Sequence, residues 1–198
     1  MKIAPRPYRM TARAVSAAHT AAAILDAAWE LFEDNAILDI TLADIAARSG
    51  VTTQTVLRRF GDKDAVFAAM FTKFANDVVE RRGRARDNAL DDVVANLVEN
   101  YELSGRLMLK MLAEEATTPG VRDFLATGRK YHREWCMTVF SGSLTDLPRT
   151  DRDRRLAQLV AICDLRTWEI LRIASGLSRQ ATELALSEML APLVKKDQ

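Results

Sequence analysis

Several residue types are scarce in this chain, and each scarcity excludes a kind of chemistry. Only two histidines and two cysteines occur among 198 residues. They form no cluster with metal-site spacing, no serine or cysteine lies in a recognisable catalytic motif, and no glycine-rich phosphate loop is present. We therefore expect no enzyme, no cofactor and no metal ion. An all-helical enzyme that uses carboxylates stays open, but no motif supports it.

Disulfides, membrane spans and export signals are equally unsupported. Cys136 and Cys163 are isolated on predicted helices, so we expect reduced core residues rather than a disulfide or a metal pair. No uninterrupted run of about 18 apolar residues exists, which argues against a membrane span. The basic, alanine-rich N-terminus resembles a signal peptide, but its helical amphipathic spacing carries Asp26 and Glu30. We expect a cytoplasmic protein.

One segment, residues 41–60, carries most of the functional information: TLADIAARSGVTTQTVLRRF. Thr41 and Thr52 are suitable N-caps for two short helices, and Gly50 can adopt the left-handed backbone of a sharp turn. Apolar residues at helical spacing give both helices a buried side: Leu42, Ile45, Ala46, Val51, Val56 and Phe60. The pattern predicts a helix-turn-helix, whose second helix enters the DNA major groove. An ordinary helical hairpin within a core is the alternative.

The flanks of this segment extend the pattern over about residues 20–67. The positions concerned are Ile24, Leu25, Ala27, Ala28, Leu31, Phe32, Thr41, Ile45, Ala46, Gly50, Val51, Thr55, Phe60 and Lys63. Their order and spacing resemble the N-terminal domain of the tetracycline-repressor-like (TetR) family of transcriptional regulators. The family usually has Gly at Asn35 and Tyr-x-His-Phe at Leu57-Arg58-Arg59-Phe60. The second departure removes a phosphate contact that the tyrosine hydroxyl would make, and Arg58 and Arg59 add charge that can replace it.

The predicted fold is all-α with about nine helices. We expect a flexible basic arm over residues 1–15 and a DNA-binding domain over residues 16–66, with its helix-turn-helix at 42–60. A helical domain for effector binding and dimerisation follows over residues 67–198. The predicted helices span about 16–34, 42–48, 53–59, 63–82, 90–102, 104–115, 120–141, 151–175 and 179–193.

The net charge is only +1, but basic residues are concentrated near the expected DNA surface. Residues 1–25 contain Lys2, Arg6, Arg9 and Arg13 and no acid. Such an arm can reach along a groove or the phosphate backbone, and a free solvated tail is the alternative.

Roles in DNA recognition follow from side-chain chemistry. Gln54 can read adenine through two hydrogen bonds, threonine methyl groups can contact thymine methyl groups, and Arg58 can contact guanine or a phosphate. Thr41 and the helix that it begins should bind a phosphate through backbone N–H groups, and the resemblance implies a phosphate contact for Lys63. The predicted DNA-binding residues are Thr41, Thr52, Thr53, Gln54, Thr55, Leu57, Arg58, Arg59 and Lys63.

An effector site is expected among bulky and adaptable side chains of the second domain. In the helix at 120–141, Gly128 leaves space, while His132 and Trp135 add polar groups to an apolar wall. The predicted effector-binding residues are Phe71, Phe74, Tyr101, Met108, Met111, His132, Trp135, Asp164 and Trp168. For any one of them, a plain core role is the alternative. We expect a small apolar or aromatic effector whose binding lowers operator affinity.

The last two predicted helices are expected to form a homodimer interface. The helix at 151–175 is apolar on more than one side, which requires burial against both its own core and a partner. The predicted interface residues are Leu159, Ile162, Leu186, Met189, Leu190 and Leu193. A monomer in which this helix is simply central is the alternative.

These expectations combine into one function: a repressor released from a palindromic operator by its effector. The alternative is a TetR-like interaction protein that has lost sequence-specific DNA binding through Leu57 and Arg59.

Overall fold

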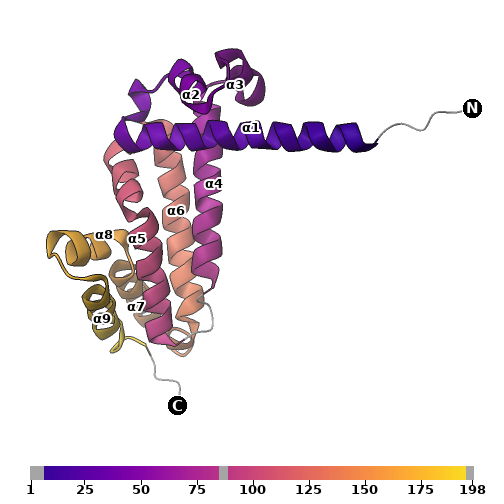
Figure 1. Ribbon diagram of the computed structural model, residues 1–198. Coiled ribbons are helices and arrows are strands. Elements are labelled where there is room, and N and C mark those ends of the chain that lie inside the picture. Colours follow the sequence, from indigo (N-terminus) through magenta and orange to yellow (C-terminus); the bar gives the residue numbers. More distant parts are fainter. Residues whose placement is uncertain (1–6, 85–88, 195–198) are drawn as a thin grey trace, which may run out of the picture. The chain divides into compact units, whose positions relative to one another are not determined.

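The computed structural model describes residues 7–84 and 89–194, with side chains from residue 14 onward. Within these ranges the chain forms nine α-helices, three shorter helical segments and no strand, which confirms the predicted all-α fold (Figure 1). The chain divides into two compact units, residues 1–74 and 75–198. The first unit therefore ends at Phe74 rather than at residue 66.

The first unit contains the predicted helix-turn-helix. Its elements are α1 (Pro7–Asp34), the 3-10 turn η1 (Ile37–Asp39), α2 (Leu42–Ser49), α3 (Thr53–Phe60) and the first part of α4 (Lys63–Gly83). Helix α1 begins at Pro7 rather than near residue 16, because proline suits a first helical position and the alanine-rich sequence favours helix. The predicted arm thus becomes helical at Pro7, and residues 1–6 lie outside the described residues.

Aromatic side chains from α1 and α4 form the core of this unit. Phe32 is fully buried, and its ring lies edge-on to Phe67 and Phe71, with centroids 6.4 and 6.1 Å away. Trp29 packs against Phe74 at 5.3 Å between ring centroids. Phe71 and Phe74, predicted as effector-binding residues, therefore lie in the aromatic core of the helix-turn-helix unit.

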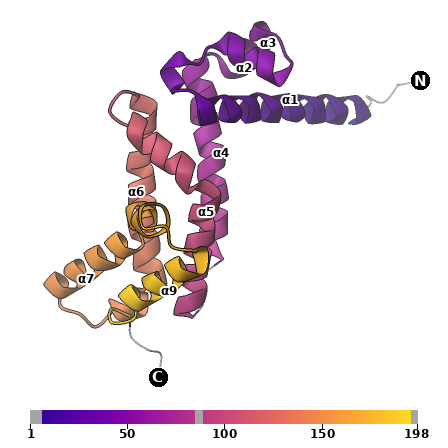
Figure 2. The ribbon, with the colours of Figure 1, turned by 60° about the vertical axis from the view of Figure 1, so that its left-hand side comes forward.

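The second unit contains the remaining helices. They are α5 (Leu90–Glu114), α6 (Pro119–Val139), the 3-10 turn η2 (Ser141–Ser143), α7 (Arg149–Ile162), α8 (Leu165–Trp168), the π-helical segment η3 (Glu169–Ala174) and α9 (Arg179–Leu190). Helix α9 packs against both α5 and α7 (Figure 2). Leu97, Leu159, Cys163, Leu186 and Leu190 are among the fully buried side chains of the shared core.

Helix α5 is continuous where the sequence predicted a break at Ser104-Gly105. The Ser104 hydroxyl is buried and donates to the Asn100 carbonyl one turn earlier, so it does not interrupt the helix. Gly105 serves close packing instead of a turn. A Cβ at this position would lie 2.6 Å from Cζ3 of Trp168. The glycine therefore lets the indole lie directly against the α5 backbone.

The predicted helix at 151–175 is also wrong as a single element, because it breaks at Cys163. The Cys163 carbonyl accepts a hydrogen bond from the Tyr101 hydroxyl at 2.8 Å, and the Asp164 carboxylate accepts from Arg166 N at 2.8 Å to cap α8. This local cap starts a new helix direction. The apolar sides predicted for one helix at 151–175 are therefore divided among α7, α8 and η3.

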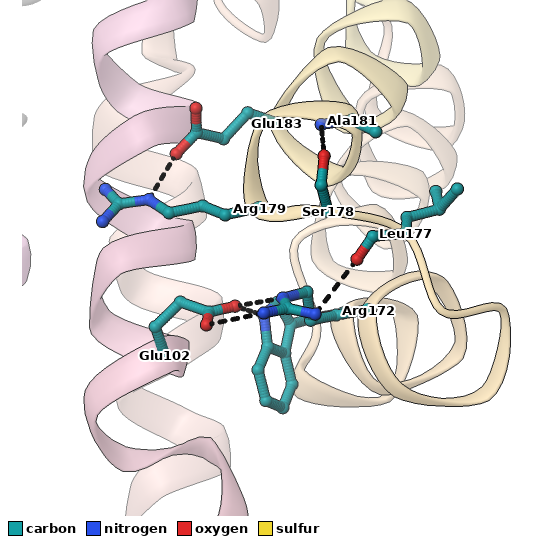
Figure 3. A network of polar contacts seen from close by, with 8 residues as sticks. Glu102, Arg172, Leu177, Ser178, Arg179, Ala181 and Glu183 are labelled. Carbon is teal, nitrogen blue, oxygen red and sulfur yellow. Dashed lines mark hydrogen bonds and ion pairs between the residues drawn. The ribbon is translucent and has the colours of Figure 1, made fainter.

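The π-helical segment is held on α5 by one carboxylate. Glu102 accepts from the Arg172 Nε at 2.8 Å and from the Trp168 indole at 3.3 Å, and Arg172 also donates to the Leu177 carbonyl (Figure 3). Beyond it, the Ser178 hydroxyl caps α9 by accepting from Ala181 N. These contacts fix the chain between α8 and α9.

Candidate functional site

Helix α2 begins with a complete capping box. The Thr41 hydroxyl accepts from Asp44 N at 3.2 Å, and the Asp44 carboxylate accepts from Thr41 N at 2.9 Å. Bonds from the hydroxyl and then the backbone of Thr41 hold the pKa of the Asp44 carboxyl below its usual value. Gly50, at φ 69°, ends the helix in the left-handed conformation that the sequence predicted.

Helix α3 begins with a second hydroxyl cap. The Thr52 hydroxyl accepts from Thr55 N at 3.2 Å. The hydroxyl groups of Thr52 and Thr55 also form a hydrogen bond with each other, with 3.0 Å between their oxygens. Both hydroxyls are therefore engaged in forming the helix start. Val56 is fully buried and fixes which side of α3 faces the core.

The opposite side of α3 is exposed. Thr53, Gln54, Leu57 and Arg58 share this side because helical neighbours lie three and four residues apart. Leu57 is 37% exposed, and Arg58 has no ion pair among the described residues. This surface presents an amide, a hydroxyl, an apolar group and a free cation, which are the groups that read base edges.

Two predicted DNA contacts have other roles in the structure. The Lys63 ammonium donates to the carbonyl oxygens of Ile37, Leu38 and Ile40 at 2.9, 3.4 and 2.8 Å, which occupies all three of its protons. The Arg59 guanidinium donates to the Ala17 carbonyl of α1. In the structure, Lys63 therefore stabilises the position of η1, and Arg59 joins α3 to α1.

The predicted effector-binding residues of the second unit are only partly brought together. Tyr101, Trp135 and Trp168 belong to one core cluster, and Met108 packs against it. Met111 is fully buried outside that cluster. Asp164 is engaged as the cap of α8.

The largest departure from the sequence analysis is a buried arginine near the end of α4. Arg82 is 3% exposed, and its guanidinium carbon lies 3.9 Å from the centroid of the Trp135 ring. Its Nη2 lies 3.1 Å from Nδ1 of His132. Arg82 lies in a sequence segment rich in basic residues, 80–86, and no local signal distinguishes it from its neighbours there.

His132 connects this arginine to α7. A guanidinium only donates, so Nδ1 of His132 accepts from Arg82 and the ring proton lies on Nε2. Nε2 then donates to the Val160 carbonyl at 3.1 Å. The histidine is therefore in its neutral form, and its imidazole stacks beside Trp135 with 6.4 Å between ring centroids.

The two cysteines are free and buried, but they are not isolated from each other. The Cys163 thiol hydrogen-bonds to Cys136, and this bond, then those from His132 and the charge of Arg82, hold the pKa of Cys136 below the usual thiol value. The same bond and burial raise the pKa of Cys163. Helix α6 and the end of α7 thus meet at a polar contact inside the core.

Three predicted interface residues are inaccessible to any partner. Leu159, Leu186 and Leu190 are at most 1% exposed and belong to the chain's own core. Ile162 and Leu193 are partly buried against the same core, and only Met189 is exposed. Ile170 and Ile173 on η3 and Leu184 on α9 are also exposed and stand outside the predicted interface list. The break at Cys163 changes which residues of 165–174 are exposed, so periodicity along one continuous helix does not give the two on η3.

Within residues 7–84 and 89–194, no helix is long and apolar enough to cross a membrane. Over the same residues, no group of three or more His, Cys, Asp or Glu side chains is placed to hold a metal ion. The fold and the exposed side of α3 instead define a helix-turn-helix protein of the DNA-binding class.

Comparisons with known proteins agree with this class. Residues 24–70 match the family model described as "Bacterial regulatory proteins, tetR family". Two uncharacterized HTH-type transcriptional regulators of Mycobacterium tuberculosis are 29% identical over 178 residues, which cover 84% of this chain and 91% of theirs.

Solved structures share the fold along most of the chain. A SmeT–triclosan complex is 22% identical with a TM-score of 0.69, and the match covers 90% of this chain and 93% of that one. A putative transcriptional regulator from Saccharomonospora viridis, in complex with choline, is 18% identical with a TM-score of 0.63 over 89% and 98% of the two chains. Residues 24–70 are therefore similar to the DNA-binding part of TetR-family regulators, and the rest of the chain shares the fold of the solved structures.

Proposed function

We propose that the chain is a homodimeric repressor that binds a palindromic operator and leaves it when a small molecule binds the second unit. The observation that carries the DNA-binding part is the exposed side of α3, where Gln54 and Arg58 have no hydrogen bond or ion pair to another described side chain. A DNA-binding role also implies a cytoplasmic location.

The proposed base contacts use this exposed side. Gln54 donates to and accepts from adenine, and Arg58 donates to guanine or to a phosphate. The Thr53 methyl group and the Leu57 side chain contact thymine methyl groups, so Leu57 has a use in place of the family's tyrosine. The N-terminus of α2, with Thr41 as its cap, binds a backbone phosphate.

The proposed dimer uses apolar residues that remain exposed after folding. Ile170, Ile173, Leu184 and Met189 are 42–62% exposed on η3 and α9. Exposed apolar residues on consecutive elements are typical of protein–protein interfaces. A two-fold axis between two such surfaces presents two α3 helices to two half-sites, which is why the operator should be palindromic.

The proposed effector site lies in the core of the second unit. Tyr101, Trp135 and Trp168 supply aromatic surface there, and Arg82 and His132 supply polar groups. SmeT is solved with triclosan and the Saccharomonospora viridis regulator with choline, so the shared fold accommodates small molecules of different charge.

Selection of bound duplexes from a random library tests the proposal. The full-length chain should enrich a palindrome, and Gln54→Ala should relax the preference at one base pair per half-site by about 1–3 kcal/mol. Gln158→Ala is the matched control, because it makes the same change at an exposed position of α7. Folded wild-type protein that enriches nothing at low salt would contradict the proposal and favour an interaction protein without sequence-specific DNA binding.

A further inference from the structure

The buried arginine described above has no counter-ion in the described part of the chain. No carboxylate of the described residues lies within ion-pair distance of Arg82, although the residue is only 3% exposed. The exposed Arg84 nearby differs, since it pairs with Glu80 at 3.1 Å. A charge that is buried without an opposite charge is strongly unfavourable in a protein interior.

The contacts that Arg82 does make offset this only in part. The Trp135 ring attracts the cation through its face, Tyr131 lies on another side at 5.6 Å, and the neutral His132 ring accepts one hydrogen bond. The Nε proton of Arg82 is fully buried and has no acceptor. Aromatic rings and a neutral imidazole therefore position the guanidinium without neutralising it.

A second buried donor in this unit also lacks an acceptor. Asn100 is 1% exposed, and its carbonyl oxygen accepts from Nε of Arg81 at 3.2 Å. This bond fixes the orientation of the amide, so Nδ2 is the atom left without a partner. Asn96 Oδ1, whose amide Nδ2 donates to the Arg81 carbonyl, is by contrast an unpaired acceptor. Because the unpaired atom of Arg82 is a donor, the partner missing at Arg82 itself is an acceptor.

We propose that Arg82 binds the carboxylate of an acidic effector, whose apolar body packs among the aromatic residues of the second unit. The proposal rests on the proposed function, because it names the chemical class of the small molecule that the regulator senses. A guanidinium with a free Nε–H matches a carboxylate, because two neighbouring N–H groups can bind its two oxygens. The expected class is a monocarboxylic acid with an aromatic or aliphatic chain, which adds a negative charge to the small apolar or aromatic effector predicted from the sequence.

His132 acts in this proposal as a positioning residue. It joins Arg82 to the Val160 carbonyl near the end of α7, so a ligand that draws the guanidinium toward itself changes a contact between α4 and α7. Helix α4 contributes residues to both compact units. A ligand that changes the contacts at the C-terminal end of α4 can therefore influence the DNA-binding unit through this helix.

The test measures binding of acids and their neutral analogues to the full chain by calorimetry and thermal unfolding. The probes are acetate, octanoate and phenylacetate, with 1-octanol and 2-phenylethanol as uncharged partners. Wild type should bind octanoate or phenylacetate at least about 30-fold more tightly than the matched alcohol. Arg82→Gln should abolish that preference, because the amide keeps a donor for His132 but carries no charge. Arg84→Gln, at an exposed position on the same helix end, should leave the preference intact.

Unfolding of the ligand-free variants gives a second, independent readout. A buried arginine without a bound anion lowers the stability of the folded chain. Arg82→Gln should therefore leave the midpoint of thermal unfolding unchanged or raise it. A purely structural arginine would give a lower midpoint than wild type, and this result would overturn the proposal. Asp87 is the one acidic residue of the segment 85–88, which lies outside the described residues, and it follows Arg82 by five positions. Asp87→Asn should not alter acid binding. Tighter acid binding in that variant would mean that the chain supplies its own counter-ion, which also overturns the proposal.

The same protein samples are assayed for operator binding without ligand. Wild type that binds an operator but shows equal affinity for acids and alcohols would overturn the acidic effector and leave the DNA-binding function intact. Acids that bind through Arg82 to a chain that binds no operator would overturn the repressor and leave the carboxylate site intact.

Discussion

The two compact units differ in how completely their polar side chains are hydrogen-bonded. In the first unit, the Thr41, Asp44 and Thr52 side chains are satisfied by groups within three residues, at exposed helix starts. In the second unit, the buried Arg82 and His132 side chains depend on partners from distant helices. Five buried side-chain atoms of the described residues lack partners: Arg82 Nε, Asn96 Oδ1, Asn100 Nδ2, Thr118 Oγ1 and Thr182 Oγ1. None of the five belongs to the first unit. The unit that presents α3 therefore has no unpaired buried side-chain atom among its described residues, whereas the core of the second unit has five.

The largest effect should come from the aromatic core of the first unit. Phe32→Ala removes a fully buried ring between Phe67 and Phe71 and should lower the free energy of unfolding by about 3–5 kcal/mol. Urea denaturation followed by circular dichroism measures this loss, and operator binding should fall with it. If operator affinity persisted while stability fell, the first unit would not be the rigid scaffold that this comparison requires.

Gly105 gives a steric test of side-chain packing in the second unit. Gly105→Ala places a Cβ 2.6 Å from Trp168 and should destabilise the chain by about 1–3 kcal/mol, although alanine is the better helix former. Gly128→Ala is the control, because nothing lies within 4 Å of its Cβ, and it should stabilise α6 by about 0.5–1 kcal/mol. Equal effects of the two substitutions in thermal unfolding would show that Trp168 does not pack on the α5 backbone.

A buried tyrosine gives a smaller effect with a pH signature. Tyr101→Phe leaves the Cys163 carbonyl without its donor and should lower the free energy of unfolding by about 1–2 kcal/mol. Burial raises the pKa of Tyr101 well above its usual value. Because the unfolded chain releases this proton first, the stabilisation is present below about pH 10 and is lost as pH rises above that value. During an alkaline titration, the tyrosinate absorbance of Tyr101 should therefore appear only when the chain unfolds. Tyr101→Phe should lower the pH of alkaline unfolding only slightly.

The smallest expected effects belong to the helix starts of the first unit. Thr52→Ala removes the α3 cap and should lower the free energy of unfolding by about 1 kcal/mol, and Thr52→Ser should restore most of it. At α2, the capping bonds lower the pKa of Asp44, so their contribution is present above the ordinary carboxyl range and is lost as pH falls through the lowered value. Asp44→Asn should weaken the acid dependence of unfolding, and an unchanged acid limb would contradict this assignment.

The sequence allowed prediction of the helix-turn-helix because its signals are local. Thr41, Gly50 and Thr52 cap or end helices within a few residues, and the structure places each of them as expected. For Lys63 the resemblance implies a phosphate contact, whereas its ammonium binds the carbonyl oxygens of Ile37, Leu38 and Ile40, which precede it by more than 20 residues. Its role depends on tertiary contacts that no local pattern contains.

The second unit was less predictable for the same physical reason. Gly105 signals a turn in the sequence, but the structure uses it to admit Trp168 from another helix. Arg82 lies in a basic run that predicts a solvated helix end, yet its neighbours Trp135 and His132 come from α6. Burial of a charge is decided by helices that are distant in sequence, so the most informative side chain of this unit is visible only in the structure.

The measurement that tests the central claim most directly is a fluorescence anisotropy titration of the full chain. It compares the enriched palindromic duplex with a scrambled duplex of equal length at physiological salt. Reading of base edges by α3 predicts at least about 1,000-fold tighter binding to the palindrome. Gln54→Ala should narrow this ratio, whereas Gln158→Ala should not. Equal affinity for the two duplexes would contradict sequence-specific recognition and leave α2 and α3 as a scaffold only.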